Sequence, residues 1–151
     1  MPANTSPIFT LSPNMAISLW TSALTANTKS DGAGTIATDM VKAVTGAANG
    51  TFVSKLRFSP CASVAATATT ASVIRVYLSS VGSGATTRTD TTLLAEIAAP
   101  AQTAAQTTTA TNFLEVPLGI IVPTGYYLHW SMHHAAAANT SWTCVPFAGD
   151  Y

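Results

Sequence analysis

Residues 51–58 carry the pattern that most restricts what this chain can fold into. Two sets of side chains alternate along the segment: Phe52, Ser54, Leu56 and Phe58 against Val53, Lys55 and Arg57. Such an alternation places successive side chains on opposite faces of a β-strand, one toward a core and one toward water. The preceding Asn49-Gly50 is a strong hairpin signal, because both residue types accept positive φ. We therefore expect a strand over 51–58, entered through a tight hairpin turn.

Similar β-prone segments recur along the chain with turn signals between them. Their starts lie about 8–12 residues apart, which is typical of a sandwich or a barrel, and no long segment has helical periodicity. Residues 16–24 fit a strand or a helix, and the Thr-rich continuation favours the strand. Residues 101–111 predict a loop or a weak strand. The other expected strands lie at 35–44, 73–78, 92–98, 112–116, 120–122, 126–134 and 141–147.

Prolines punctuate the start of the chain, at positions 2, 7 and 13. Because proline fixes φ and lacks an N–H donor, residues 1–15 predict an extended arm rather than a helix. Ile8, Phe9 and Leu11 would give this arm apolar side chains to bury on a neighbouring subunit, so they are the candidate partner-binding residues. Residues 16–151 are then expected to form a single domain.

Charge is scarce in this chain and in balance. Charged residues are 8% of the sequence with a formal net charge of +0, against about 25% charged residues in a typical soluble domain. A nucleic-acid binder needs Lys and Arg to neutralise phosphates, and an anionic membrane surface also attracts basic segments, so neither partner is expected. No apolar run is long enough to span a membrane as a helix. The composition favours a surface that is covered by protein, the alternative being a monomer kept soluble by its hydroxyl groups.

Cysteine usage points to a reducing compartment. The first residues have neither the basic nor the apolar segment of a signal peptide, so no export is expected. Cys61 and Cys144 are then expected to be small buried side chains, with a disulfide between them as the alternative.

Enzyme signatures are absent from the sequence. The glycine pairs Gly32-x-Gly34 and Gly82-x-Gly84 lie in Thr/Ser-rich loops without a complete nucleotide-binding motif. No pair among the six acidic residues is singled out as catalytic, and Glu96 and Glu115 are expected to face solvent. We therefore expect a protein that is not an enzyme and has no cofactor.

Three histidines, His129, His133 and His134, form the one cluster that merits weighing as a metal site. On a strand, His129 and His133 share a face but lie about 13 Å apart, and His133 and His134 point to opposite faces. A metal site within one chain is therefore not expected. The alternative is that histidines of several subunits meet at a symmetry axis.

Aromatic side chains recur along 126–134 as well. Tyr126, Leu128, Trp130 and Met132 share one face of the expected strand. Such a stripe is typical of a core, although Tyr and Trp side chains could also form a sugar-binding platform.

Six segments occur in a recognisable order: Leu24–Thr38, Gly46–Phe58, Leu93–Pro100, Val116–Leu118, Val122–Tyr126 and the terminal Phe147-Ala-Gly-Asp-Tyr151. In this order they resemble a group of small virion-associated proteins of tailed bacteriophages, which often end in Gly-Asp-Tyr. The resemblance covers about residues 16–151 and is carried mainly by turn and strand signals. It implies an all-β fold, an antiparallel β-sandwich or jelly roll, on the phage particle.

The resemblance also implies a function. The leading expectation is a capsid decoration or cement protein, which binds between major capsid protein subunits as a homotrimer and stabilises the phage head after assembly in the host cytoplasm. The alternative is a tail or tail-fibre component that touches host glycans through Trp and Tyr side chains. If the arm is a tether, deleting residues 2–13 should abolish capsid binding and leave the fold intact.

Overall fold

The computed structural model describes residues 10–63, 67–104 and 113–151, and within these ranges the chain is entirely β. The all-β fold class is therefore confirmed for the described residues. None of their segments is a helix of the length and apolarity needed to cross a membrane.

The strands differ widely in length. In chain order they are β1 (Ser12–Asn14), β2 (Ser18–Thr21), β3 (Gly34–Thr35), β4 (Val41–Thr45), β5 (Thr51–Ala62), β6 (Thr67–Ala68), β7 (Ser72–Ser79), β8 (Ala85–Thr86), β9 (Thr91–Ala99), β10 (Thr103–Ala104), β11 (Leu114–Val122), β12 (Tyr127–Met132) and β13 (Thr140–Asp150).

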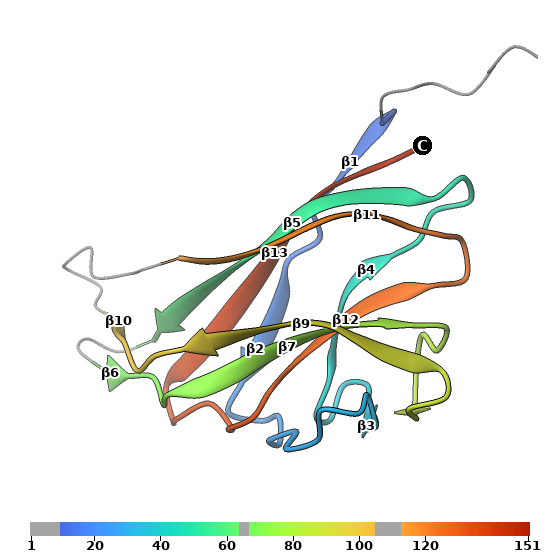
Figure 1. Ribbon diagram of the computed structural model, residues 1–151. Coiled ribbons are helices and arrows are strands. Elements are labelled where there is room, and N and C mark those ends of the chain that lie inside the picture. The colour runs from blue at the N-terminus through green and yellow to red at the C-terminus, as the bar shows by residue number, and fades with distance from the viewer. Residues whose placement is uncertain (1–9, 64–66, 105–112) are drawn as a thin grey trace, which may run out of the picture.

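Most of these strands belong to two antiparallel sheets (Figure 1). The first sheet has the order β1-β13-β5-β11, with β2 also paired to β13. The second sheet has the order β4-β12-β7-β9. Two short ribbons, β3 with β8 and β6 with β10, lie outside these sheets. Strands from the two ends of the chain, β2 and β13, thus lie side by side, and β12 and β13 are consecutive strands in different sheets.

The inner faces of both sheets share one hydrophobic core. Trp130 of β12 lies at its centre, with its ring centroid 5.2 Å from that of Phe58 and 5.8 Å from that of Trp20, both in the first sheet. The indole N–H of Trp130 donates a hydrogen bond of 2.9 Å to the hydroxyl of Ser18. The remaining fully buried large side chains of this core are Trp142, Leu56, Ile74, Leu128, Met132 and Val44.

Several predicted strands are confirmed. The expected segments 73–78, 92–98, 126–134 and 141–147 correspond to β7, β9, β12 and β13. The ambiguous segment 16–24 contains the strand β2. Of the segment 101–111, expected to be a loop or a weak strand, residues 103–104 form β10, and residues 105–111 lie outside the described residues. Residues 114–116 of the strand expected at 112–116 and the strand expected at 120–122 belong to one strand, β11, which continues through Pro117. A proline is tolerated there because β11 is the edge of its sheet.

The single strand expected over 35–44 is wrong. The chain turns within it, since Ala37 has a φ of 68° and its N–H donates a hydrogen bond to the carbonyl of Met40 at 2.8 Å. The carboxylate of Asp39 accepts a hydrogen bond from the Thr35 N–H and closes the same turn. This turn separates β3 from β4, which pair with different strands.

The hairpin expected at Asn49-Gly50 is also wrong. A turn is present and Gly50 has a φ of 94°, but the strands on either side of it, β4 and β5, belong to different sheets. The dipeptide therefore marks a corner where the chain crosses between the sheets. The local sequence encodes the reversal of direction, whereas the pairing partner is set by tertiary contacts.

The alternation expected over 51–58 holds after Ser54, from Lys55 to Phe58, but not before it. Ser54 has no partner in the register between β5 and β13, which runs from Lys55 directly to Val53. This β-bulge turns Val53 toward the core, where it is fully buried together with Leu56 and Phe58. Phe52, which was expected on the core face, is half-buried on the other face.

The described part of the N-terminal arm is attached to the chain's own sheet. Ser12–Asn14 form β1, paired with the end of β13, and the Leu11 N–H donates to the carbonyl of Asp150 at 2.7 Å. The amide of Asn14 donates to the Asp150 carboxylate at 3.0 Å. Ile8 and Phe9 lie outside the described residues. A deletion of residues 2–13 would therefore remove part of an edge strand as well as the arm.

Candidate interaction surfaces

The two sheets differ in what covers their outer faces. On the second sheet, Arg75, Tyr77, His129 and Ser131 face outward and are nonetheless buried, because loops of the same chain lie over them. On the first sheet, the outward side chains stay exposed or half-buried, and no loop among the described residues is hydrogen-bonded across them. The outer face of the first sheet is therefore the candidate surface for a partner.

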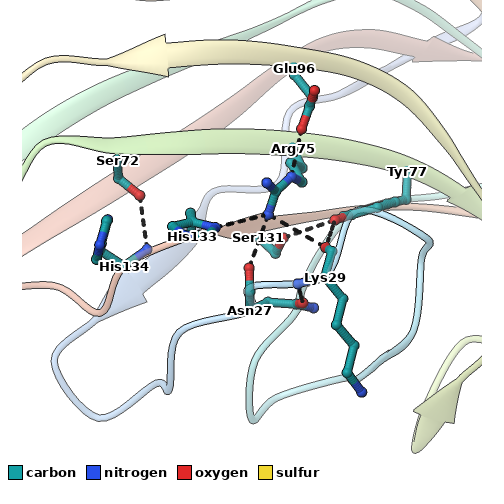
Figure 2. A network of polar contacts seen from close by, with 9 residues as sticks. All are labelled: Asn27, Lys29, Ser72, Arg75, Tyr77, Glu96, Ser131, His133 and His134. Atoms are coloured by element: carbon teal, nitrogen blue, oxygen red, sulfur yellow. Dashed lines mark hydrogen bonds and ion pairs between the residues drawn. The ribbon is translucent and has the colours of Figure 1, made fainter.

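A polar network fastens the loop around Asn27 to the second sheet (Figure 2). The Arg75 guanidinium donates from Nη1 to the carbonyl of Asn27 at 3.1 Å and from Nε to the Glu96 carboxylate at 2.6 Å. The Tyr77 hydroxyl donates to the carbonyl of Lys29 at 3.1 Å. Figure 2 shows the Lys29 side chain pointing away from these contacts, so only its backbone takes part. The network covers the sheet and presents no open chemical site.

His129 lies under a second loop on the same face. Its Nε2 lies 2.8 Å from the carbonyl oxygen of Val81. Because a carbonyl oxygen only accepts, Nε2 carries the proton and donates this hydrogen bond. The imidazole ring stacks on the ring of Tyr127 at a centroid distance of 6.1 Å. Its Nδ1 is buried without a hydrogen-bond partner among the described residues. Burial lowers the pKa of His129, and the neighbouring Lys42 lowers it further. His129 is thus a neutral structural side chain.

The first sheet carries a cluster of cations and aromatic rings on its outer face, defined here as the cation–aromatic cluster: Lys55, Arg57, Phe113, Glu115 and Phe147. Lys55 Nζ lies 2.9 Å and Arg57 Nη2 2.7 Å from Glu115 Oε1. The Arg57 guanidinium lies 5.1 Å from the ring centroids of both Phe113 and Phe147, and Lys55 Nζ lies 4.9 Å from that of Phe147. Hydrogen bonds from Lys55 and Arg57 hold the pKa of Glu115 below its usual value.

The strand register explains this assembly. Arg57 of β5 pairs with Glu115 of β11 on one side and with Val145 of β13 on the other. Lys55 pairs with Phe147 in the same sheet. Residues that are paired across strands share a face, so side chains from three strands converge. The sequence shows Lys55 and Arg57 on one face, but nothing in it reports that Glu115 and Phe147 lie beside them.

A second surface, the apolar edge, consists of Leu11, Met15, Ile17 and Leu19 on and around β1 and β2. Their exposed fractions are 72%, 50%, 68% and 50%. These residues are half of the large hydrophobic side chains that are exposed in the described part of the chain. No charged residue occurs before Lys29 in the sequence. Asp150 of β13 does lie beside β1, where its carboxylate accepts from Asn14. An edge with this much exposed apolar surface is typical of a protein–protein contact.

Of the residues predicted to bind a partner, only Leu11 is in the described part, and it is exposed as expected. The histidine arrangement differs from the prediction, because β12 ends at Met132. His133 and His134 do not point to opposite faces: their rings touch edge to face with centroids 4.9 Å apart. Within residues 10–63, 67–104 and 113–151, no group of three or more His, Cys, Asp or Glu side chains could hold a metal ion.

The aromatic stripe along β12 is mostly core, as predicted. Leu128, Trp130 and Met132 are buried, and Tyr126 is 41% exposed, outside the strand. Trp20 and Trp142 are buried as well. No tryptophan is therefore available to stack on a sugar.

Both cysteines are free, and Cys144 is buried as expected, whereas Cys61 is half-buried. Burial raises the pKa of the Cys144 thiol to about 12. Cys144 is therefore a small core side chain and not a reactive group. Glu96 and Glu115 are exposed as predicted, but both are engaged in ion pairs, with Arg75 and with Lys55 and Arg57.

Comparisons with known proteins return no relative: no family model, no curated protein and no solved structure matches this chain. The candidate surfaces are thus defined by their geometry alone.

Replacing Arg75 by Met should destabilise the protein by about 2 kcal/mol, because loop carbonyls that are buried on the sheet lose a charged donor. Urea denaturation measures this change as a lower midpoint. Arg88→Met is the matched control, since Arg88 is exposed in a loop, and such substitutions change stability by less than about 0.5 kcal/mol. Equal losses in the two variants would show that the network does not fasten the loop.

The free energy of unfolding should depend on His129 at acidic pH. Because the pKa of His129 is lowered from 6.5 in the folded state, the unfolded chain takes up a proton below that pH before the folded chain does. Stability is then complete above pH 6.5 and falls below it, by at most about 1.4 kcal/mol per pH unit from this group. His129→Gln keeps an N–H for the Val81 carbonyl but does not titrate. Urea denaturation should show a shallower acidic decline in this variant, and parallel profiles would contradict the assignment.

Proposed function

We propose that this chain is a non-enzymatic structural protein of a tailed-phage particle, a capsid decoration protein that binds between major capsid protein subunits and stabilises the head. The observation that carries the docking part is the apolar edge, where four large hydrophobic side chains are exposed. The phage setting is supported by the resemblance of residues 16–151 to virion-associated proteins.

The proposed architecture is a jelly-roll β-sandwich. Its support is the order in which the chain visits the sheets. The eight main strands are β2, β4, β5, β7, β9, β11, β12 and β13. If they are renumbered 1 to 8 in chain order, the first sheet has the order 1-8-3-6 and the second sheet has the order 2-7-4-5. That order is the one produced by folding a long antiparallel hairpin into two sheets. Jelly rolls are frequent in viral capsid proteins, which is an analogy of fold and not evidence of function.

The apolar edge can supply the energy of such docking. Each large apolar side chain that becomes fully buried contributes about 1.5–3 kcal/mol, so burial of Leu11, Met15, Ile17 and Leu19 would offset much of the entropic cost of association. On a particle with many equivalent positions, modest affinity at each position yields high occupancy if the copies also contact one another. A homotrimer would provide such contacts, and an N-terminal tether through Ile8 and Phe9 would extend them.

A glycan-binding tail component is the weaker alternative. It was expected to use Trp and Tyr side chains, and all tryptophans are buried. The chain could also lie on the tail without binding glycans. Quantitative mass spectrometry of purified virions distinguishes this location from the head. Head decoration requires a copy number comparable to that of the major capsid protein, whereas a few copies per particle would place the chain on the tail.

Replacing Ile17 and Leu19 by Ser should abolish binding to capsids that lack this protein, because the apolar contact is lost while the exposed positions leave the fold intact. Co-sedimentation with capsids measures the binding. Leu94→Ser is the matched control, since Leu94 is 37% exposed on the second sheet, and it should bind like the wild type. Undiminished binding of the Ile17/Leu19 variant would remove the apolar edge from the proposed interface.

A further inference from the structure

The cation–aromatic cluster is a second surface feature that the proposed docking through the apolar edge does not use. It joins two cations to a single carboxylate, which leaves one positive charge in excess. Glu115 accepts from Lys55 and from Nε and Nη2 of Arg57. Nη1 of Arg57 makes no hydrogen bond to any of the described residues. The cluster therefore has both a charge and a donor available for another acceptor.

The guanidinium is also held in place before any partner arrives. It lies 5.1 Å from the ring centroids of both Phe113 and Phe147, and contacts of this kind restrict its rotation. Binding to a prepositioned guanidinium costs less side-chain entropy than binding to a mobile one. Its side chain remains 37% exposed, so a partner can reach it.

An exposed aromatic ring borders the two cations on the same face. Phe113 is 57% exposed, and its ring centroid lies 5.1 Å from the Arg57 guanidinium. A small hydrophilic anion would leave this ring in water. A protein surface that presents a carboxylate beside an apolar side chain would cover the ring while pairing with the cations.

We propose that the cation–aromatic cluster is a docking site for a carboxylate on a partner protein, which pairs with Lys55 and Arg57 while an apolar neighbour of that carboxylate packs on Phe113. A second copy of this chain fits less well, because face-to-face contact would bring two clusters with the same excess charge together. This inference rests on the proposed docking function, but it does not depend on the phage setting or on the apolar edge.

A peptide titration tests this assignment. The probe is the blocked tripeptide acetyl-Leu-Glu-Leu-amide, and its twin with Gln in place of Glu, together with acetate, serve as comparisons. Nuclear magnetic resonance spectra of the labelled full chain report the shift changes. The Glu peptide should cause saturating changes with millimolar affinity at Lys55, Arg57 and Glu115, weaker changes should follow with the Gln peptide, and acetate should not reproduce them.

Variants give effects of opposite sign. Arg57→Met and Lys55→Met should each weaken binding of the Glu peptide by about twofold to fivefold, the range expected for an exposed ion pair. Glu115→Gln should strengthen it by a similar factor, because the internal carboxylate no longer competes for the cations. Arg88→Met, which removes a cation elsewhere, should leave the affinity unchanged. A variant that fails to fold is recognised by the loss of the resonances of core residues. Glu115→Gln is the only one of these variants that is expected to bind the Glu peptide more tightly than the wild type.

Several outcomes would overturn the inference. They are the absence of saturating changes at millimolar peptide, equal affinity for the Glu and Gln peptides, equal effects of acetate, or weaker binding to Glu115→Gln. Without peptide, the resonances of this face could also shift as the protein concentration rises. If those shifts are absent in Arg57→Met, the face binds a second copy of this chain instead. Changes confined to residues 11–19 would also contradict it, while leaving docking through the apolar edge intact. Loss of capsid binding in the Ile17/Leu19 variant bears only on the proposed function, so the two failures are distinguishable.

Discussion

The contact of Trp130 with Phe58 and Trp20 holds the structure together. Trp130 belongs to the second sheet and its ring partners belong to the first, so the contact closes the space between them. The hydrogen bond from its indole N–H to Ser18 satisfies a buried donor at the same point. Because β2 is joined to the first sheet only through β13, this contact also fixes the edge that carries Ile17 and Leu19.

Once the two inner faces are buried against each other, each sheet still has an outer face to cover. The second sheet is covered by its own loops, at the cost of burying Arg75 and His129 in positions that need partners. Backbone carbonyls of the loops provide those partners. The first sheet receives no comparable cover from the described residues, and its exposed side chains include aromatic and aliphatic ones. The same chain thus covers one outer face with its own loops, whereas the side chains on the other face remain exposed or half-buried among the described residues.

Sequence patterns predicted the strands better than their partners. Strand positions follow from local alternation, so 73–78 and 141–147 were found with small errors at their ends. The corner at Asn49-Gly50 and the bulge at Ser54 depend on which strand lies alongside, and a local pattern does not contain that information. The cation–aromatic cluster could not be predicted for the same reason, because Arg57 and Glu115 are far apart in the sequence and meet only through the register of β5 and β11.

The edge strands of both sheets are irregular, which disfavours backbone pairing of these edges with another chain. Long regular edges are templates for pairing with another chain, and irregularities in them prevent this. In the first sheet, the edge strand β11 contains Pro117 and a register shift beyond it, and β1 contains Pro13. In the second sheet, the registers of both edge strands shift, β4 at Ala43 and β9 at Leu94. A protein with so little charge has weak electrostatic protection against aggregation, so interrupted edge strands are a second means of preventing unspecific strand pairing. The docking proposed above would then use side chains, at the apolar edge and the cation–aromatic cluster, rather than backbone pairing.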